Sequence, residues 1–101
     1  MKGGNSVRTF QLDNEPNRLY FTNYNRIDEE VLFQDIFETL KNCKDIEIGR
    51  KHIGPSEDLY DCKLSDFSFT LVYDIDYGIY IQVDDVKIIP RLENLFEVKN
   101  G

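Results

Sequence analysis

Two aspartates separated by one residue are the first feature of this sequence that could do chemistry. Asp74-Ile-Asp76 has the spacing that opens a calcium-binding loop, where alternate carboxylates supply oxygen ligands. Such a loop needs a third oxygen ligand where Gly78 stands and a glycine one position later. The pattern therefore fits the turn of a β-hairpin better, and we expect neither a metal nor a cofactor. Weak ion binding by the two carboxylates is the alternative.

Other short patterns give little support for catalysis. Asp61-Cys-Lys63 and Glu97-Val-Lys99 have the acid-x-Lys form found at metal-dependent nuclease sites, but such three-residue patterns occur by chance in any charged protein. His52 is the single histidine, and we expect it in a loop without a serine or cysteine at the spacing of a nucleophilic triad. The sequence therefore predicts a protein that is not an enzyme.

Acidic residues are concentrated in one segment. The chain has a net charge of -7, and the range 57–85 combines a single lysine, Lys63, with these carboxylates: Glu57, Asp58, Asp61, Asp66, Asp74, Asp76, Asp84 and Asp85. This segment would repel the phosphates of nucleic acid, so we expect no nucleic-acid ligand. It favours a basic protein as partner, and a merely soluble surface is the alternative.

The elements that position these carboxylates begin with a β-hairpin over residues 66–85. Apolar residues alternate with polar ones from Phe67 to Ile75 and again from Ile79 to Val83, which is typical of strands with one buried face. A three-residue loop over 76–78 would pair Ile75 with Ile79 and keep the apolar side chains on one face. Gly78 would then supply the left-handed residue that such loops need.

A third strand should precede this hairpin and complete an antiparallel meander. Residues 57–64 also alternate, and a connection through Ser65 and Asp66 would pair Leu64 with Phe67 and Cys62 with Phe69. Because neither connecting residue is the glycine that tight hairpins favour, the loop could be longer. Earlier strands are expected over 6–13, with Phe10 and Leu12 facing inward, over 18–24 and over 45–49.

One main helix is predicted at about residues 28–43. Asp28 suits the N-cap, and Ile27 with Leu32 stand in the positions of a hydrophobic staple. Apolar residues recur at three- and four-residue spacing from Leu32 to Leu40 and form a stripe that would pack on the sheet. In the tail, Pro90 could open a short C-terminal helix, with a strand over 95–98 as the alternative.

Composition and length are those of one α+β domain over residues 1–101. The fold class we expect is an antiparallel meander with the main helix packed on it. No apolar run approaches the length of a membrane span, and the start of the chain lacks the apolar segment of a signal peptide, so we expect a cytoplasmic protein without a membrane partner. Cys43 and Cys62 are expected as free thiols.

The expected contact surface combines carboxylates with exposed polar and aromatic residues of the acidic segment. In the derived register Tyr80 lies on the solvent-facing side of the sheet beside Asp74, and Tyr77 lies in the turn. Exposed tyrosines among carboxylates could anchor a basic partner. The candidate partner-binding residues are Asp58, Asp61, Asp74, Asp76, Tyr77, Tyr80, Gln82, Asp84 and Asp85.

The run Ile53-Gly-Pro-Ser-Glu-Asp-Leu-Tyr-Asp-Cys62 leads into Phe67-Ser-Phe-Thr-Leu-Val-Tyr-Asp-Ile-Asp-Tyr-Gly-Ile-Tyr-Ile81. In length, acidity and strand-turn style this part of the chain, residues 53–85, resembles the small acidic immunity proteins of bacterial polymorphic-toxin systems, contact-dependent growth inhibition above all. The resemblance implies an inhibitor that binds a cognate toxin domain, in such systems often a basic nuclease, and it carries over no catalytic residue. The alternatives are an acidic regulatory module for another basic protein, including a phosphate-mimicking inhibitor, and a small metal-dependent hydrolase built on Asp74 and Asp76.

Overall fold

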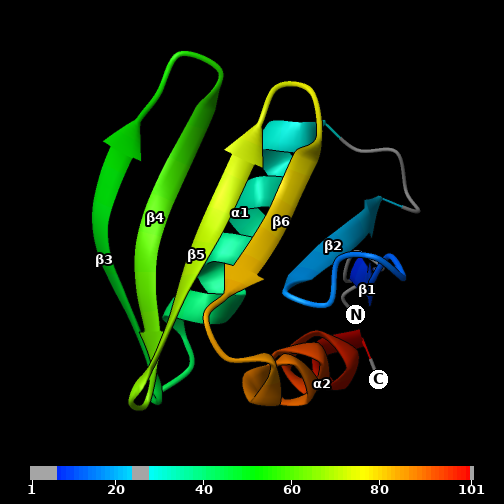
Figure 1. Ribbon diagram of the computed structural model, residues 1–101, viewed down its shortest axis with the longest axis vertical. Coiled ribbons are helices and arrows are strands. Elements are labelled where there is room, and N and C mark those ends of the chain that lie inside the picture. Colours follow the sequence, from blue (N-terminus) through cyan, green and yellow to red (C-terminus); the bar gives the residue numbers. More distant parts are fainter. Residues whose placement is uncertain (1–6, 24–27, 101) are drawn as a thin grey trace.

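The computed structural model describes residues 7–23 and 28–100 of the chain. Six strands form one antiparallel sheet in the order β1-β2-β6-β5-β4-β3 (Figure 1). Their bounds are β1 Val7–Phe10, β2 Arg18–Asn23, β3 Ile46–Ile53, β4 Glu57–Leu64, β5 Phe67–Asp74 and β6 Gly78–Val83. The helices are α1 Glu29–Lys41, a 3-10 turn η1 Val86–Ile88, and α2 Ile89–Asn100. The α+β class expected from the sequence is therefore confirmed.

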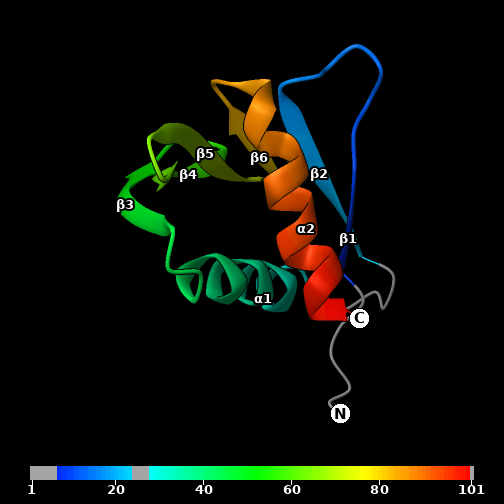
Figure 2. The ribbon, with the colours of Figure 1, turned by 90° about the horizontal axis from the view of Figure 1, so that it is seen from below.

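Both helices lie on the same side of the sheet. In Figure 2 the strands β3 to β6 form one layer above α1, while β2 and β1 bend down beside α2, so that the sheet curls around this helix. The core between the layers joins the stripe of α1 to alternate residues of the strands and to Leu92 and Phe96 of α2. Phe96 packs edge-on against Phe21 of β2 with ring centroids 4.9 Å apart. We call the other side of the sheet the open face.

The main helix follows the predicted stripe. Leu32, Phe33, Ile36 and Leu40 are buried, as their spacing requires. Asp28 occupies the N-cap position, but its side chain makes no capping hydrogen bond. Its backbone carbonyl accepts the first helical hydrogen bond, from the N–H of Leu32 at 2.9 Å. Ile27, the other half of the predicted hydrophobic staple, lies outside the described residues.

The turn between β5 and β6 begins one residue earlier than the sequence predicted. The pairs are Asp74↔Gly78 and Tyr73↔Ile79, so the three-residue loop is 75–77 and Ile75 is a loop residue, not a partner of Ile79. The carboxylate of Asp74 causes the early turn, because its Oδ1 accepts the N–H groups of Asp76 at 2.7 Å and of Tyr77 at 3.0 Å. The predicted left-handed residue is confirmed, since Gly78 has a φ of 82°.

The meander of β4 and β5 has the predicted register. Leu64 pairs with Phe67 and Cys62 with Phe69. The loop is nevertheless tight, because Ser65 adopts a φ of 55°, a left-handed conformation that hairpin loops usually assign to glycine. The longer connection considered from the sequence is therefore not needed.

Both edges of the sheet differ from the sequence expectation. β3 continues to Ile53 across an irregularity between Ile48 and Lys51, so His52 lies in a strand and not in a loop. At the other edge β1 ends at Phe10, which is 42% exposed, and Leu12 is exposed beyond the strand. Phe10 does not face the core, because it pairs with Tyr20 and stacks on its ring across the open face, with centroids 5.5 Å apart.

The tail contains the short helix rather than a last strand. Asp85 starts η1 by accepting the backbone N–H of Lys87 through Oδ1 at 2.9 Å. α2 follows directly with Pro90 in its first turn, where the missing N–H breaks no helical hydrogen bond. Ile89, Leu92 and Phe96 are buried against the sheet as predicted.

Candidate functional site

Two hairpin turns and the start of α1 meet at one end of the molecule, visible at the top of Figure 1. The backbone N–H of Ile75 donates to the carbonyl of Ser56 at 2.9 Å and ties the turn after β5 to the turn before β4. The helix closes the group, because a Cβ on Gly78 would lie 3.6 Å from Oε2 of Glu29. We call residues 28–30, 53–58 and 74–77 together the acidic end.

The acidic end has one sign of charge. Its three segments contain no lysine, arginine or histidine, and the nearest cation that contacts them in the described chain is Lys51, whose Nζ lies 3.9 Å from Oδ2 of Asp58. Glu57 and Asp74 are paired across β4 and β5, which places two carboxylates on neighbouring strands. The seven acidic residues of this end are Asp28, Glu29, Glu30, Glu57, Asp58, Asp74 and Asp76.

Large apolar side chains project from the same end. Ile53, Ile75 and Tyr77 are 77%, 76% and 69% exposed, more than any other large hydrophobic residue in the described part of the chain. The turn that begins at Asp74 accounts for two of them, because it places Ile75 and Tyr77 outside the pleated strand, whereas Ile53 is the last residue of the edge strand β3. Exposed apolar groups ringed by polar ones are typical of a surface that binds another protein.

Between the two turns lies a hollow of about 300 Å³. Tyr73 lines it from β5 and Pro55 from the turn between β3 and β4. Burial raises the pKa of Tyr73, and the nearby carboxylates of Glu29, Glu30 and Asp58 raise it further. Among the described residues, the hollow is thus lined by the carboxylates of Glu30, Glu57 and Asp58 and by no cation, a charge distribution that favours a cationic group.

Four of the nine candidate residues meet at this end, namely Asp58, Asp74, Asp76 and Tyr77. Asp74 has a structural role there, because its carboxylate already accepts two backbone N–H groups. Asp85 is likewise used to start η1. The sequence missed Ile53 and Ile75 as surface residues, since alternation assigned Ile75 to the core.

Tyr80 was expected at the solvent, and this prediction is wrong. It lies on the open face as derived, but only 8% of it is exposed, because it packs between Val72 of β5 and Tyr20 of β2. The guanidinium of Arg18 lies 4.8 Å from its ring centroid. Burial is also the main cause of its raised pKa. Tyr80 is therefore a packing residue and cannot anchor a partner.

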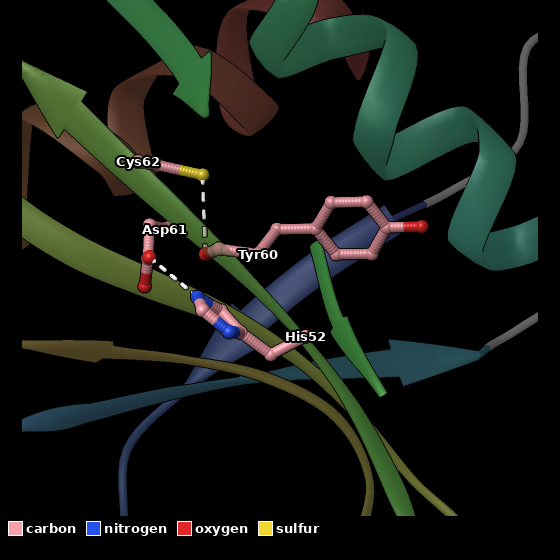
Figure 3. A network of polar contacts seen from close by, with 4 residues as sticks. All are labelled: His52, Tyr60, Asp61 and Cys62. Carbon is pink, nitrogen blue, oxygen red and sulfur yellow. Dashed lines mark hydrogen bonds and ion pairs between the residues drawn. The ribbon is translucent and has the colours of Figure 1, made fainter. Parts of the chain in front are cut away.

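The remaining three candidates, Asp61, Gln82 and Asp84, are exposed on the open face or at its border. Oδ2 of Asp61 lies 2.8 Å from Nε2 of His52, within hydrogen-bond distance, and the carboxylate is the acceptor (Figure 3). Asp61 and Asp84 also line a shallow hollow of about 390 Å³ with Lys63. These residues are thus separate from the acidic end, and the nine candidates do not form one surface.

Of the two acid-x-Lys patterns, Asp61 and Lys63 line the same hollow, whereas the side chains of Glu97 and Lys99 lie outside the described part of the structure. In the described residues no group of three or more His, Cys, Asp or Glu side chains is arranged to hold a metal ion. Cys62 is turned to the opposite side of β4 from Asp61, and its thiol contacts the carbonyl of Tyr60 at 3.5 Å (Figure 3). Burial raises the pKa of Cys62 to about 11, which suppresses the thiolate.

Comparison of the chain with protein-family models, with curated proteins and with solved structures finds no match. Neither helix in the described ranges combines the length and the apolar character required to cross a bilayer.

Proposed function

We propose that this protein is an immunity protein that binds a cognate toxin domain in the cytoplasm and neutralises it through the acidic end. The observation that carries the proposal is the coincidence of seven carboxylates with Ile53, Ile75 and Tyr77 on one end of the fold. The resemblance of residues 53–85 to acidic immunity proteins supports the same partner class. A basic nuclease domain is the partner whose charge best complements this surface.

Charge and apolar contact would have different roles in such a complex. The carboxylates attract a basic partner over a distance comparable to the Debye length, about 8 Å at physiological ionic strength, and thus speed its association. Tyr77, Ile75 and Ile53 would be desolvated in the complex and slow its dissociation. The carboxylates that line the hollow beside Tyr73 would accept a lysine or arginine side chain of the partner.

The proposal predicts that a toxin domain is encoded next to this gene, and it is tested by co-expression of the protein with that domain. We expect the protein to restore growth and to co-purify with the toxin domain at a one-to-one ratio. Asp76→Lys should weaken the complex, measured by calorimetry at low salt, and the weakening should shrink at high salt. Asp66→Lys is the matched control, because Asp66 occupies the hairpin turn at the other end of β5 and has the same charge.

Either of two results would reject the proposal. One is a toxin domain that remains lethal and unbound in the presence of the protein. The other is a complex that Asp66→Lys and Asp76→Lys weaken equally, because the acidic end would then have no special part in binding. An acidic regulator of a different basic protein would give the first result.

A further inference from the structure

A second surface lies at the opposite end of β3 from the acidic end. β3 is an edge strand with β4 as its sheet neighbour (Figure 1). The carbonyl of Asp45, just before β3, accepts the N–H of Ser65 at 2.9 Å and therefore points toward β4. Because backbone groups alternate in direction along a strand, the N–H and C=O of Ile48 point away from the sheet. They are available to a further strand.

The two sheet edges are protected to different degrees. β1 has four residues and packs beside α2, which are common ways to prevent unwanted strand pairing. β3 has eight residues, and its protection is the irregularity between Ile48 and Lys51, which interrupts the regular strand. The half of β3 before this irregularity, Ile46–Ile48, keeps a regular register with β4. Strand addition is therefore restricted to that half.

An apolar groove lies beside Ile46–Ile48 of β3, on the side of the sheet that faces α1. It has a volume of about 320 Å³ between α1 and the edge strand. Phe37, Ile48 and Tyr60, three of its lining residues, are only partly buried although they pack on the core. A residue added opposite Ile48 would face the same side of the sheet as Ile48, so its side chain would enter this groove.

The charge around the groove is opposite to that of the acidic end. Of the described residues, those that line it include Lys41 and no carboxylate. In a chain with a net charge of -7, Lys41 gives the groove a local positive charge, which favours a ligand with a carboxylate.

We propose that β3 and α1 form a second binding site that takes an extended peptide segment by strand addition. The segment pairs its backbone with Ile48, inserts one aliphatic or aromatic side chain into the groove, and presents a carboxylate to Lys41. Main-chain hydrogen bonds supply affinity in this type of site and the pocket supplies specificity. The site is independent of the acidic end, so the failure of either proposal leaves the other standing.

The test starts from a phage-displayed library of random decapeptides selected on the immobilised protein. We expect enrichment of peptides that combine an apolar residue with a carboxylate. A fluorescent synthetic copy of an enriched peptide is then measured by anisotropy. Lys41→Glu should weaken its binding at least about fivefold by charge reversal, while Lys87→Glu, the same change on η1 outside the groove, should leave it unaltered.

Ile48→Pro tests the strand pairing itself. Proline removes the outward N–H of Ile48 without removing a hydrogen bond to β4, and proline is tolerated on edge strands. Binding should be lost, and N-methylation of the peptide at alternate positions should have the same effect. If Ile48→Pro does not fold, the affinity of the peptide for Lys41→Glu alone tests the site.

Three results would overturn the inference. The first is a library that shows no enrichment. The second is an enriched peptide that binds Lys41→Glu, or a folded Ile48→Pro, as well as it binds the original protein. The third is a concentration-dependent dimer that Ile48→Pro dissociates, because the edge would then belong to a second copy of the chain.

Discussion

Asp74 offers the sharpest test of the structure, because the same carboxylate could stabilise the turn or bind a partner. Its Oδ1 accepts two backbone N–H groups, at 2.7 and 3.0 Å. A typical hydrogen bond contributes about 0.5–1.5 kcal/mol net to stability. Asp74 is half-buried, and water can partly replace the lost acceptor. We therefore expect Asp74→Ala to lower the free energy of unfolding by about 1–2 kcal/mol, or the melting temperature by roughly 5–10 °C.

Two further variants separate the acceptor from the charge. Asp74→Asn keeps an oxygen that can accept both N–H groups, so it should cost less than about 0.5 kcal/mol. Asp76→Ala removes the same charge from the same turn but leaves both hydrogen bonds, and it should be neutral or slightly stabilising because the end carries excess negative charge. Urea unfolding followed by circular dichroism gives the three values under one condition.

The pattern of the three variants decides the interpretation. Equal destabilisation by Asp74→Ala and Asp76→Ala would refute the role of Asp74 as the acceptor that starts the turn. Asp74→Asn that is as harmful as Asp74→Ala would assign the effect to charge instead. If the expected order holds, Asp74→Asn becomes the variant of choice for partner binding, since it changes the charge and keeps the turn.

Three other predictions concern the partner, alkaline pH and the core. Replacing Ile75 and Tyr77 together by serine should weaken toxin binding by about 10–100-fold without loss of stability, and Leu12→Ser is the exposed control; unchanged affinity would remove the turn from the interface. Folding raises the pKa of Cys62 from 9.0 to about 11. The neutral thiol therefore contributes about 2.7 kcal/mol at most to the free energy of unfolding, and this contribution is present below pH 9 and is lost as the pH rises toward 11. Urea unfolding at pH 8 and pH 10.5 should show this loss, and Cys62→Ala should reduce the difference between the two pH values. Leu71→Ala, at a position with 0% exposure under α1, should cost about 2–5 kcal/mol in the same assay, and a cost below 1 kcal/mol would contradict its place in the core.

The sequence located the faces of the meander because alternation depends only on neighbouring residues. It could not locate the turn after β5, since a shift of register by two residues leaves every side chain on the same face. The deciding interaction was the carboxylate of Asp74, which competes locally for the backbone N–H groups. Ile75 was consequently placed in the core instead of at the surface.

Tyr80 and His52 illustrate a different limit. Tyr80 is buried because β2 pairs with β6 and brings Tyr20 beside it, and no local pattern indicates that two distant segments will pair. His52 is in a strand because β3 tolerates an irregularity after Ile48, where the alternation expected from Asp45 to Gly49 breaks down. Asp58, Asp74, Asp76 and Tyr77 were therefore found from the sequence, while Ile53 and Ile75 were recognised as surface residues only in the folded structure.

The short pairing between β2 and β6 suggests that the two parts of the sheet form one after the other. β4 pairs with β5 at eight positions through a two-residue connection, whereas β2 pairs with β6 at three positions, between segments far apart in the chain. Closing that long loop costs more entropy than forming the adjacent hairpins. We expect β3 to β6 to assemble as an early unit, and the hairpin of β1 and β2 to dock late and to open first. Amide hydrogen exchange would show it as a separate, less protected unit.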